Sequence, residues 1–553
     1  MKLKLKLRLA LALMTVPSFF LMVAAPSFAQ TKTASADYAD LVALYEEFRG
    51  SVAPPVVNGV PDYSPAAMAR QFEQLKELQK RMKAIDDSDW PIAQRVDYMV
   101  VSAEMRGLEF QHRVVEPWKR DPAYYSTTNL GFGPKMHGAL AIPKLPLAPD
   151  ELIEFKAKLD AVPEALKQAR ANLTDPRGDL ARLAIVQKEV EENVYGELAA
   201  SAAKLQPALE PSAQRAKAAA ADYKAWLQQI EAGLPAHGGV GEDNYAWYLR
   251  HVLLLPYTPE EIAVIGEREY QRQVAFLKIE EHRNRSIAMP DPVTTRTEFD
   301  EKRMKEDEDL LAFLRDGDWV TIPDYVKHDP DEGPYQFPFE KDPSKPGLFD
   351  PPLDLHFFFQ AEFRDGRPLR AHNLPGHAFD SLQAARDDRP VRGAPRLFFV
   401  NGVRTEGWAF YLEEMILQAG MLENLPKTRE IDYILGAKRA ARVLPELKMQ
   451  KNEWTWKQAN ESLIARTPKW MEENDAVAQF DIELYLRQPG YGIGYYMGKV
   501  ELEKLLSEVA MQEGAAFDIK SFHDRFRAAG SIPISLIRWE MTGRDDEVRT
   551  MRD

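Results

Sequence analysis

Two glutamates seven residues apart, Glu406 and Glu413, are well placed to do chemistry in this 553-residue chain. Seven residues are nearly two turns of an α-helix, so both carboxylates lie on one helix face. With Trp408 and Tyr411 beside them, the pair could serve as a metal ligand and as the partner that orients a ligand. The alternative is a helix start, in which Thr405 caps the helix and the negative charge of Glu406 interacts favourably with the positive end of the helix dipole.

Two histidines, His372 and His377, precede this segment. His377 follows Pro375 and Gly376, a pair that breaks a regular helix and can redirect the next side chain. Residues five apart point about 140° away from each other in a regular α-helix, so the two imidazoles would share a face poorly. A bulge at the glycine could bring them together. The alternative for each histidine is an ordinary surface or core position.

The stretches 371–378 (A-H-N-L-P-G-H-A) and 405–413 (T-E-G-W-A-F-Y-L-E) resemble a bacterial family, DUF885, that is similar to gluzincin-type zinc peptidases. In that family the first stretch usually reads H-E-x-x-P-G-H-H and the second E-G-W-A-x-Y-x-E. The second is intact here. The first keeps Pro-Gly-His but has lost the His-Glu pair at its start, and Ala378 replaces its last histidine.

Further stretches resemble the same family, in order along most of the chain. Residues 258–262 and 266–269 match a helix start of the family, 488–498 resemble its P-G-Q-A-x-x-Y-x-x-G, and 522–533 resemble its F-H and G-S-x-P near the C-terminus. The chain is therefore identified as a member of DUF885 with a degenerate first motif.

The resemblance implies a zinc centre with His377 and Glu406 among its ligands, an open position for water and a glutamate as base. Two alignments are possible. With Pro-Gly-His held fixed, Ala371 replaces the first histidine and His372 replaces the glutamate. With one residue deleted, His372 corresponds to the first histidine of the motif and joins His377 and Glu406 as a metal ligand. Asn373 then stands at the position of the catalytic base. Both alignments lose the catalytic glutamate, and the first also loses a metal ligand. In the second, asparagine cannot act as the base, because it does not accept a proton at neutral pH.

Further roles are implied for neighbouring residues, beside simpler alternatives. We expect His372 as substitute base, supported by Glu413, because the pKa of histidine suits proton transfer. Tyr495 is expected to donate to a developing oxyanion, or else to be a core aromatic. Arg404 and Arg487 are expected to bind a substrate carboxylate, or else to form structural ion pairs. Trp408 and Tyr411 are expected to contact the substrate.

Helical periodicity dominates the chain, and Thr258-Pro259-Glu260-Glu261 is a capping-box start for a helix to about Arg283. Other helices are predicted over 38–49, 65–85, 91–114, 150–172, 191–231, 405–419, 428–449, 454–467 and 494–514. Residues 316–369 are rich in Pro, Asp and Gly, which predicts loops with a strand over 353–363, and a second strand is predicted over 396–401. The predicted fold is mainly α and zinc-peptidase-like, with a small sheet near the metal cleft.

Residues 1–29 read as a signal peptide, with a basic start, an apolar run and a small-residue cleavage site. The chain has no Cys, so no lipoprotein anchor is expected, and the mature protein should be periplasmic or secreted without a membrane attachment. A net charge of −14 argues against nucleic acid as a partner. A helical N-terminal part (36–235) and a metallopeptidase-like C-terminal part (236–553) are expected, unless the Gly-rich stretch 232–239 is a loop within one continuous domain.

Two functions follow from the resemblance. The first is an exported zinc-dependent peptidase with an altered site. The second is a pseudoenzyme that binds a peptide or a partner protein without turnover. The missing glutamate favours the second, whereas the intact Glu406 stretch and Tyr495 favour surviving chemistry. The sequence does not indicate the oligomeric state.

Overall fold

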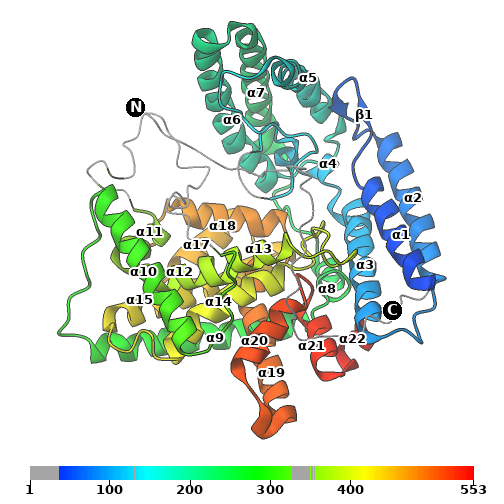
Figure 1. The fold of residues 1–553 in the computed structure, drawn as a ribbon. Coiled ribbons are helices and arrows are strands. Elements are labelled where there is room, and N and C mark those ends of the chain that lie inside the picture. Colours follow the sequence, from blue (N-terminus) through cyan, green and yellow to red (C-terminus); the bar gives the residue numbers. More distant parts are fainter. Residues whose placement is uncertain (1–35, 130–132, 327–348, 350–352, 354, 553) are drawn as a thin grey trace, which may run out of the picture.

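Helices make up most of the chain in the computed structural model, which describes residues 36–552 apart from 130–132, 327–348, 350–352 and 354 (Figure 1). The prediction of a mainly α fold is confirmed. Strands in the described part of the chain form one antiparallel hairpin, β1 (Val56–Val57) with β2 (Val60–Pro61). The predicted signal peptide lies outside the described residues. None of the helices described is long and apolar enough to cross a bilayer.

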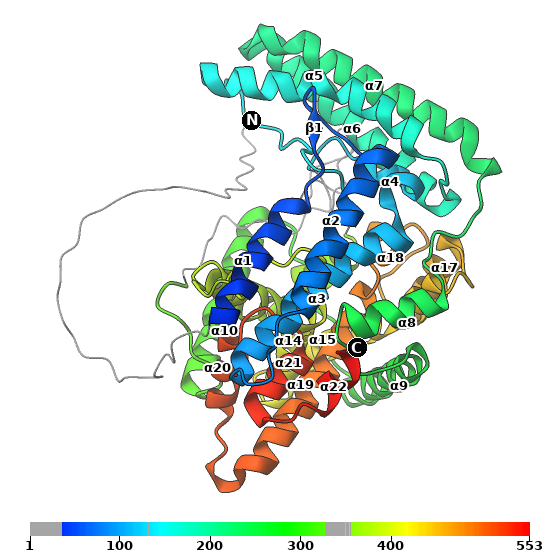
Figure 2. The same cartoon turned by 90° about the vertical axis from the view of Figure 1, so that its right-hand side faces the viewer.

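The N-terminal helices pack side by side along one flank of the molecule (Figures 1 and 2). They agree with the helices predicted there and comprise α1 (Ala36–Ser51), α2 (Pro65–Lys83) and α3 (Ile92–Phe110). Short turns follow as the chain leaves α3: the π-helical η1 (Gln111–Val115), α4 (Pro117–Arg120) and the 3-10 turn η2 (Pro122–Tyr125).

Three long helices then form a lobe that projects from the rest of the molecule (Figure 1). They are α5 (Pro149–Asn172), α6 (Gly178–Leu205) and α7 (Glu210–Ile230). The single helix predicted over 191–231 is wrong, because the chain breaks between α6 and α7 at the 3-10 turn η3 (Pro207–Leu209). Proline has no amide hydrogen and restricts the residue before it, so the Ala-rich pattern could not continue as one helix.

The remaining helices form the main body, and most of the helices predicted there are confirmed within a few residues. Thr258 caps α9 with the predicted capping box. The helices are α8 (Glu242–His251), α9 (Pro259–Arg283), α10 (Arg296–Asp316), α11 (Phe357–Asp365), α12 (Arg367–Ala371), α13 (Phe379–Ala384), α14 (Gly402–Gln418), α15 (Pro426–Ala441), α16 (Val443–Gln450), α17 (Trp456–Arg466), α18 (Ala476–Arg487), α19 (Tyr491–Glu513), α20 (Ile519–Ala528), α21 (Ile534–Thr542) and α22 (Asp546–Met551), with 3-10 turns η4 (Glu231–Gly233) and η6 (Gly514–Ala516) and the π-helical turn η5 (His372–Ala378).

The small sheet predicted between about 350 and 403 is wrong. Residues 357–365 form α11, whose first turn is capped when the amide of Phe359 donates to Nδ1 of His356. A short aromatic run does not distinguish a buried helix from a strand. Residues 396–401 form turns, with Phe399 at a φ of 59° and its ring stacked on Tyr491.

Two large clusters of buried apolar side chains make up most of the core. One joins α1 and α3 to the C-terminal helices, and the other joins the α5–α7 lobe to α17 and α18. Each cluster therefore contains residues from both sides of position 235. The division of the chain near that position stays a prediction.

Helix α14 lies at the centre of the main body, in contact with α19, η5, α12 and α15. Its approach to α19 is very close. A Cβ atom added to Gly407 would lie 2.4 Å from the Cα of Gly498, and one added to Gly498 would lie 2.0 Å from the carbonyl oxygen of Val403. Only glycine fits at these two positions, since protein interiors are close-packed. The contact brings the first turn of α19 beside Glu406.

We expect Gly498→Ala to lower the free energy of unfolding by about 1–3 kcal/mol or more, because the new methyl group must push α14 and α19 apart. The control is Gly50→Ala in α1, where an added Cβ meets nothing within 4 Å. Alanine there should leave the protein as stable or raise its stability by about 1 kcal/mol. Thermal unfolding followed by circular dichroism measures both. Equal melting temperatures for the two variants would contradict the close approach.

Candidate metal centre

The first histidine segment folds as a π-helical turn, η5 (His372–Ala378), between the α-helical segments α12 and α13. In a π-helix each backbone amide donates a hydrogen bond to the carbonyl of the fifth residue before it. The amide of Phe379 donates in this way to the carbonyl of Leu374. Residues five apart then lie on the same side of the turn. The i, i+5 spacing that would separate His372 and His377 in an α-helix brings them together here.

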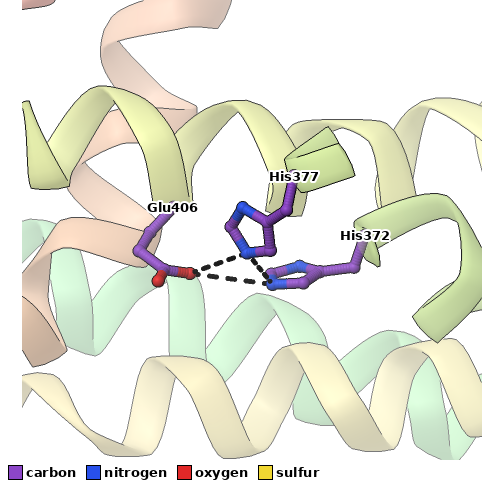
Figure 3. A group of neighbouring side chains, drawn as sticks. All are labelled: His372, His377 and Glu406. Carbon is purple, nitrogen blue, oxygen red and sulfur yellow. Dashed lines mark hydrogen bonds and ion pairs between the residues drawn. The ribbon is translucent and has the colours of Figure 1, made fainter. Parts of the chain in front are cut away.

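Three ligand atoms converge at this turn (Figure 3). Nε2 of His377 lies 3.0 Å from Nε2 of His372, within hydrogen-bond distance. Oε2 of Glu406, on the first turns of α14, lies 3.6 Å from each of these nitrogens. The arrangement corresponds to the alignment with one residue deleted, in which His372 is the first histidine. It does not correspond to the one in which Ala371 takes that place.

Two of the ligand side chains, His372 and Glu406, have a further contact through the polar atom that faces away from the other ligands. Oε1 of Glu413 lies 2.6 Å from Nδ1 of His372, and Arg439 holds the same oxygen at 2.6 Å. The hydroxyl of Tyr491 donates to Oε1 of Glu406 at 2.7 Å, which leaves Oε2 directed at the histidines. A carboxylate behind a ligating histidine and a donor behind a ligating carboxylate are the usual supports of a metal site.

Helix α14 also fixes the π-helical turn itself. The indole Nε1 of Trp408 donates to the carbonyl of Pro375 at 3.3 Å. A Cβ atom on Gly376 would lie 2.9 Å from the Cβ of Ala409, so the turn rests against the helix backbone. The E-G-W-A stretch therefore supplies the carboxylate and also the surface that holds the histidine turn in place.

The ligand group is buried, and its most accessible member is His377. The exposed fraction of that side chain is 26%, against 10% for His372 and 8% for Glu406. Burial alone would raise the pKa of Glu406, but the neighbouring His377 and His372 outweigh it and hold that pKa well below its usual range. Burial lowers the pKa of His377, but Glu406 overcomes this effect and raises it.

The donor set and its spacing fit zinc. Two imidazole nitrogens and one carboxylate oxygen are a common three-ligand set, which leaves a fourth position open. Ligand atoms on a tetrahedron with bonds of about 2.0–2.2 Å lie about 3.3–3.6 Å apart, close to the 3.0 and 3.6 Å separations found here. Oε2 of Glu406 is buried and has no hydrogen-bond partner, which is costly unless a cation satisfies it.

Tyr495 lies beside the ligand group, one turn after Tyr491 on α19. Its ring stacks on His372 with the centroids 6.3 Å apart, and the guanidinium of Arg442 lies 4.3 Å from its centre. Burial first, and then Glu406, raise the pKa of Tyr495. The phenol therefore stays protonated at neutral pH and remains a hydrogen-bond donor.

The four residues predicted to bind substrate have other partners in the structure, and their contact with a substrate stays a prediction. Arg404 is buried in an ion pair with Asp380, and Arg487 pairs with Asp121. Trp408 is fully buried against η5, and the hydroxyl of Tyr411 lies 2.9 Å from Nε2 of a buried histidine in α20. Their side chains join separate segments of the chain.

Tyr491, Arg439 and Arg442 were not predicted from the sequence. Tyr491 carried one usable signal, because it precedes Tyr495 by four residues and so shares its helix face. Arg439 and Arg442 carried none, since they reach the site from α15 and from the turn that follows it. Glu413, which was predicted as catalytic, lies behind His372, beside the ring nitrogen that faces away from the other ligand atoms.

The helical fold and the His-His-Glu group define a mainly α protein with a candidate metal centre. The chain belongs to DUF885, described as bacterial protein of unknown function, whose family model matches residues 51–304 and 370–541. No curated protein matches the chain in sequence.

Two solved structures share the fold over nearly their whole lengths. One is a candidate lipoprotein of unknown function from Shewanella oneidensis, with 19% identity and a TM-score of 0.67, and the match covers 92% of this chain and 98% of that one. The other is a candidate lipoprotein from Colwellia psychrerythraea, with 17% identity and a TM-score of 0.65, covering 92% and 99%. At these identities the likeness concerns the fold alone.

The opposite pKa shifts of Glu406 and His377 predict a pH-dependent stability in protein treated with a chelator. The depressed pKa of Glu406 stabilises the fold above its ordinary value of 4.5, and this contribution is lost as pH falls through the folded pKa. The raised pKa of His377 stabilises the fold below its ordinary value of 6.5, and this contribution is lost as pH rises through the folded pKa.

The pair therefore stabilises most between pH 4.5 and 6.5. We expect Glu406→Gln to lower the melting temperature most near about pH 6 and progressively less toward about pH 9. The control is Glu77→Gln, at an exposed position of α2. A decrease in the melting temperature of Glu406→Gln that is the same at every pH would contradict the electrostatic coupling between Glu406 and His377.

Proposed function

We propose that the protein is an exported zinc-dependent hydrolase of peptides with low turnover, built on an altered peptidase site. The observation that carries the proposal is the separation of 3.0, 3.6 and 3.6 Å among Nε2 of His377, Nε2 of His372 and Oε2 of Glu406. Peptide as the substrate class rests on the resemblance of the two motifs to those of gluzincin-type peptidases.

Export rests on the pattern of residues 1–29, and the description of both structural neighbours as candidate lipoproteins agrees with it. The chain itself has no cysteine to carry a lipid.

His372, His377 and Glu406 would hold the ion, which would act as a Lewis acid and acidify a water molecule at its open position. Glu413 fixes the orientation of His372 through its other ring nitrogen, and Tyr491 fixes that of Glu406. Both nitrogens of His372 are then engaged, so it cannot also act as the substitute base. Tyr495 remains protonated and can donate to a carbonyl oxygen that gains negative charge.

Proton abstraction is the weak point of this site. In either alignment the base position holds no carboxylate, and Glu413 is separated from the ligand atoms by the ring of His372. Loss of a positioned general base typically costs about 10²–10⁴-fold in rate. The proposed enzyme should therefore bind zinc well and hydrolyse peptides slowly.

Zinc binding is tested by metal analysis of the purified mature protein. We expect one zinc ion per chain, and a much weaker affinity in His377→Ala and Glu406→Ala, by more than the about 10–100-fold that loss of a supporting residue causes. His282→Ala, at an exposed position of α9, is the control and should keep its zinc. Wild-type protein that binds zinc no better than the two ligand variants would refute the proposal.

The missing base gives a second prediction. Because His372 occupies the place of the first histidine, Asn373→Glu should restore a carboxylate next to it and raise peptide hydrolysis by about 10²-fold or more. Asn373→Gln is the matched control and should not raise it. Unchanged hydrolysis in a zinc-loaded Asn373→Glu protein would favour the alternative, a peptide-binding pseudoenzyme without turnover.

A further inference from the structure

A polar pocket lies where the α5–α7 lobe joins the main body, and we refer to it as the joint pocket. Its volume is about 450 Å³, and its lining includes Arg113 of η1, Arg120 of α4, Arg177 before α6, and His237 and Gly239 of the connector between α7 and α8. No residue of the candidate metal centre lines it.

Backbone contacts fix the walls of the joint pocket. The amide of Gly178 donates to Pro235 at 2.8 Å, and that of Gly241 donates to Gln450 at 2.8 Å. A Cβ atom added to Gly239 would lie 2.1 Å from the carbonyl oxygen of Met449, so the connector lies directly on the end of α16. The pocket is therefore preformed, which reduces the entropy lost when a ligand binds.

The lining is basic in a chain whose net charge is −14. It contains three guanidinium groups and one imidazole, and none of its residues is acidic. Carboxylates act on each of these arginines, and those on Arg120 include Glu116 and Asp121. Glu109 is 3.4 Å from Nε of Arg113, and Asp175 is shared by Arg177 and, at 3.7 Å, by Arg120.

One guanidinium donor of the pocket has no partner. Carboxylates pair with the three guanidinium groups, but Nε of Arg177 is buried without a hydrogen-bond partner. Burial first, and then the like charge of Arg177, lower the pKa of Arg120 against the opposing effect of three nearby carboxylates. A bound anion would relieve this repulsion and satisfy the buried donor. Guanidinium groups bind phosphate and carboxylate oxygens through paired hydrogen bonds.

We infer that the joint pocket binds a small soluble anion carrying phosphate or carboxylate groups, at a site separate from the metal centre. The ligand would contact Arg113 of η1 and Arg177 at the start of the lobe, which both line the pocket. The site is thus a small-molecule pocket that does not depend on the proposed hydrolase activity.

The test uses isothermal titration calorimetry of the full mature protein at constant ionic strength, with inorganic pyrophosphate and citrate as probes. We expect one of them to bind, and Arg113→Gln and Arg177→Gln each to weaken that binding about ten- to a hundredfold. Tighter binding of pyrophosphate identifies a phosphate ligand, and tighter binding of citrate identifies a carboxylate ligand. Arg296→Gln, in an exposed ion pair of α10, is the control and should bind as the wild type does.

Both probes can also bind a zinc ion, so His377→Ala is titrated beside the arginine variants. Anion binding that survives in His377→Ala and weakens in Arg113→Gln and Arg177→Gln supports the joint pocket even if zinc is not bound at all. Binding that is lost in His377→Ala and kept in both arginine variants would assign the anion to the metal centre and overturn the inference. Absence of binding by either probe would overturn it too.

Discussion

The close approach of two segments to helix α14 is the constraint on which the rest of the site depends. Gly407 lets α19 pack against α14 at Gly498, and Gly376 lets the π-helical turn pack against Ala409. A side chain at either glycine would separate these segments by several tenths of an ångström or more, since the added carbon would lie within 3.0 Å of its neighbours. The contact at Gly407 sets the position of Tyr491 beside Glu406, and the contact at Gly376 sets the histidines.

Buried charge is the second requirement, because ionic groups inside a protein destabilise the fold unless they are paired. Glu413 is fully buried between His372 and Arg439, and Asp481 of α18 pairs with Arg442, which covers the ring of Tyr495. This network fixes the orientation of the ligand side chains from behind. A cation at the ligand atoms would complete it, since Oε2 of Glu406 is one of the buried acceptors of this network without a hydrogen-bond partner.

Local sequence signals predicted the helices well, because caps and apolar periodicity act over a few residues. The capping box at Thr258 is an example. One error arose where a short pattern was ambiguous, in the aromatic run of α11, and another where a proline interrupts the Ala-rich stretch 191–231. The convergence of His372 with His377 depended on a π-helical turn, for which only the Pro-Gly pair gave a hint. Arg439 could not have been found, because its contact with Glu413 joins two helices that no sequence pattern relates.

The central claim is that His372, His377 and Glu406 form one zinc site. Its most direct test is a crystal structure of the mature protein grown with zinc, with diffraction measured on both sides of the zinc absorption edge. The account predicts one strong anomalous peak about 2.0–2.2 Å from Nε2 of both histidines and from Oε2 of Glu406. A structure without a peak there, or with His372 turned away from a zinc ion bound by other residues, would contradict it.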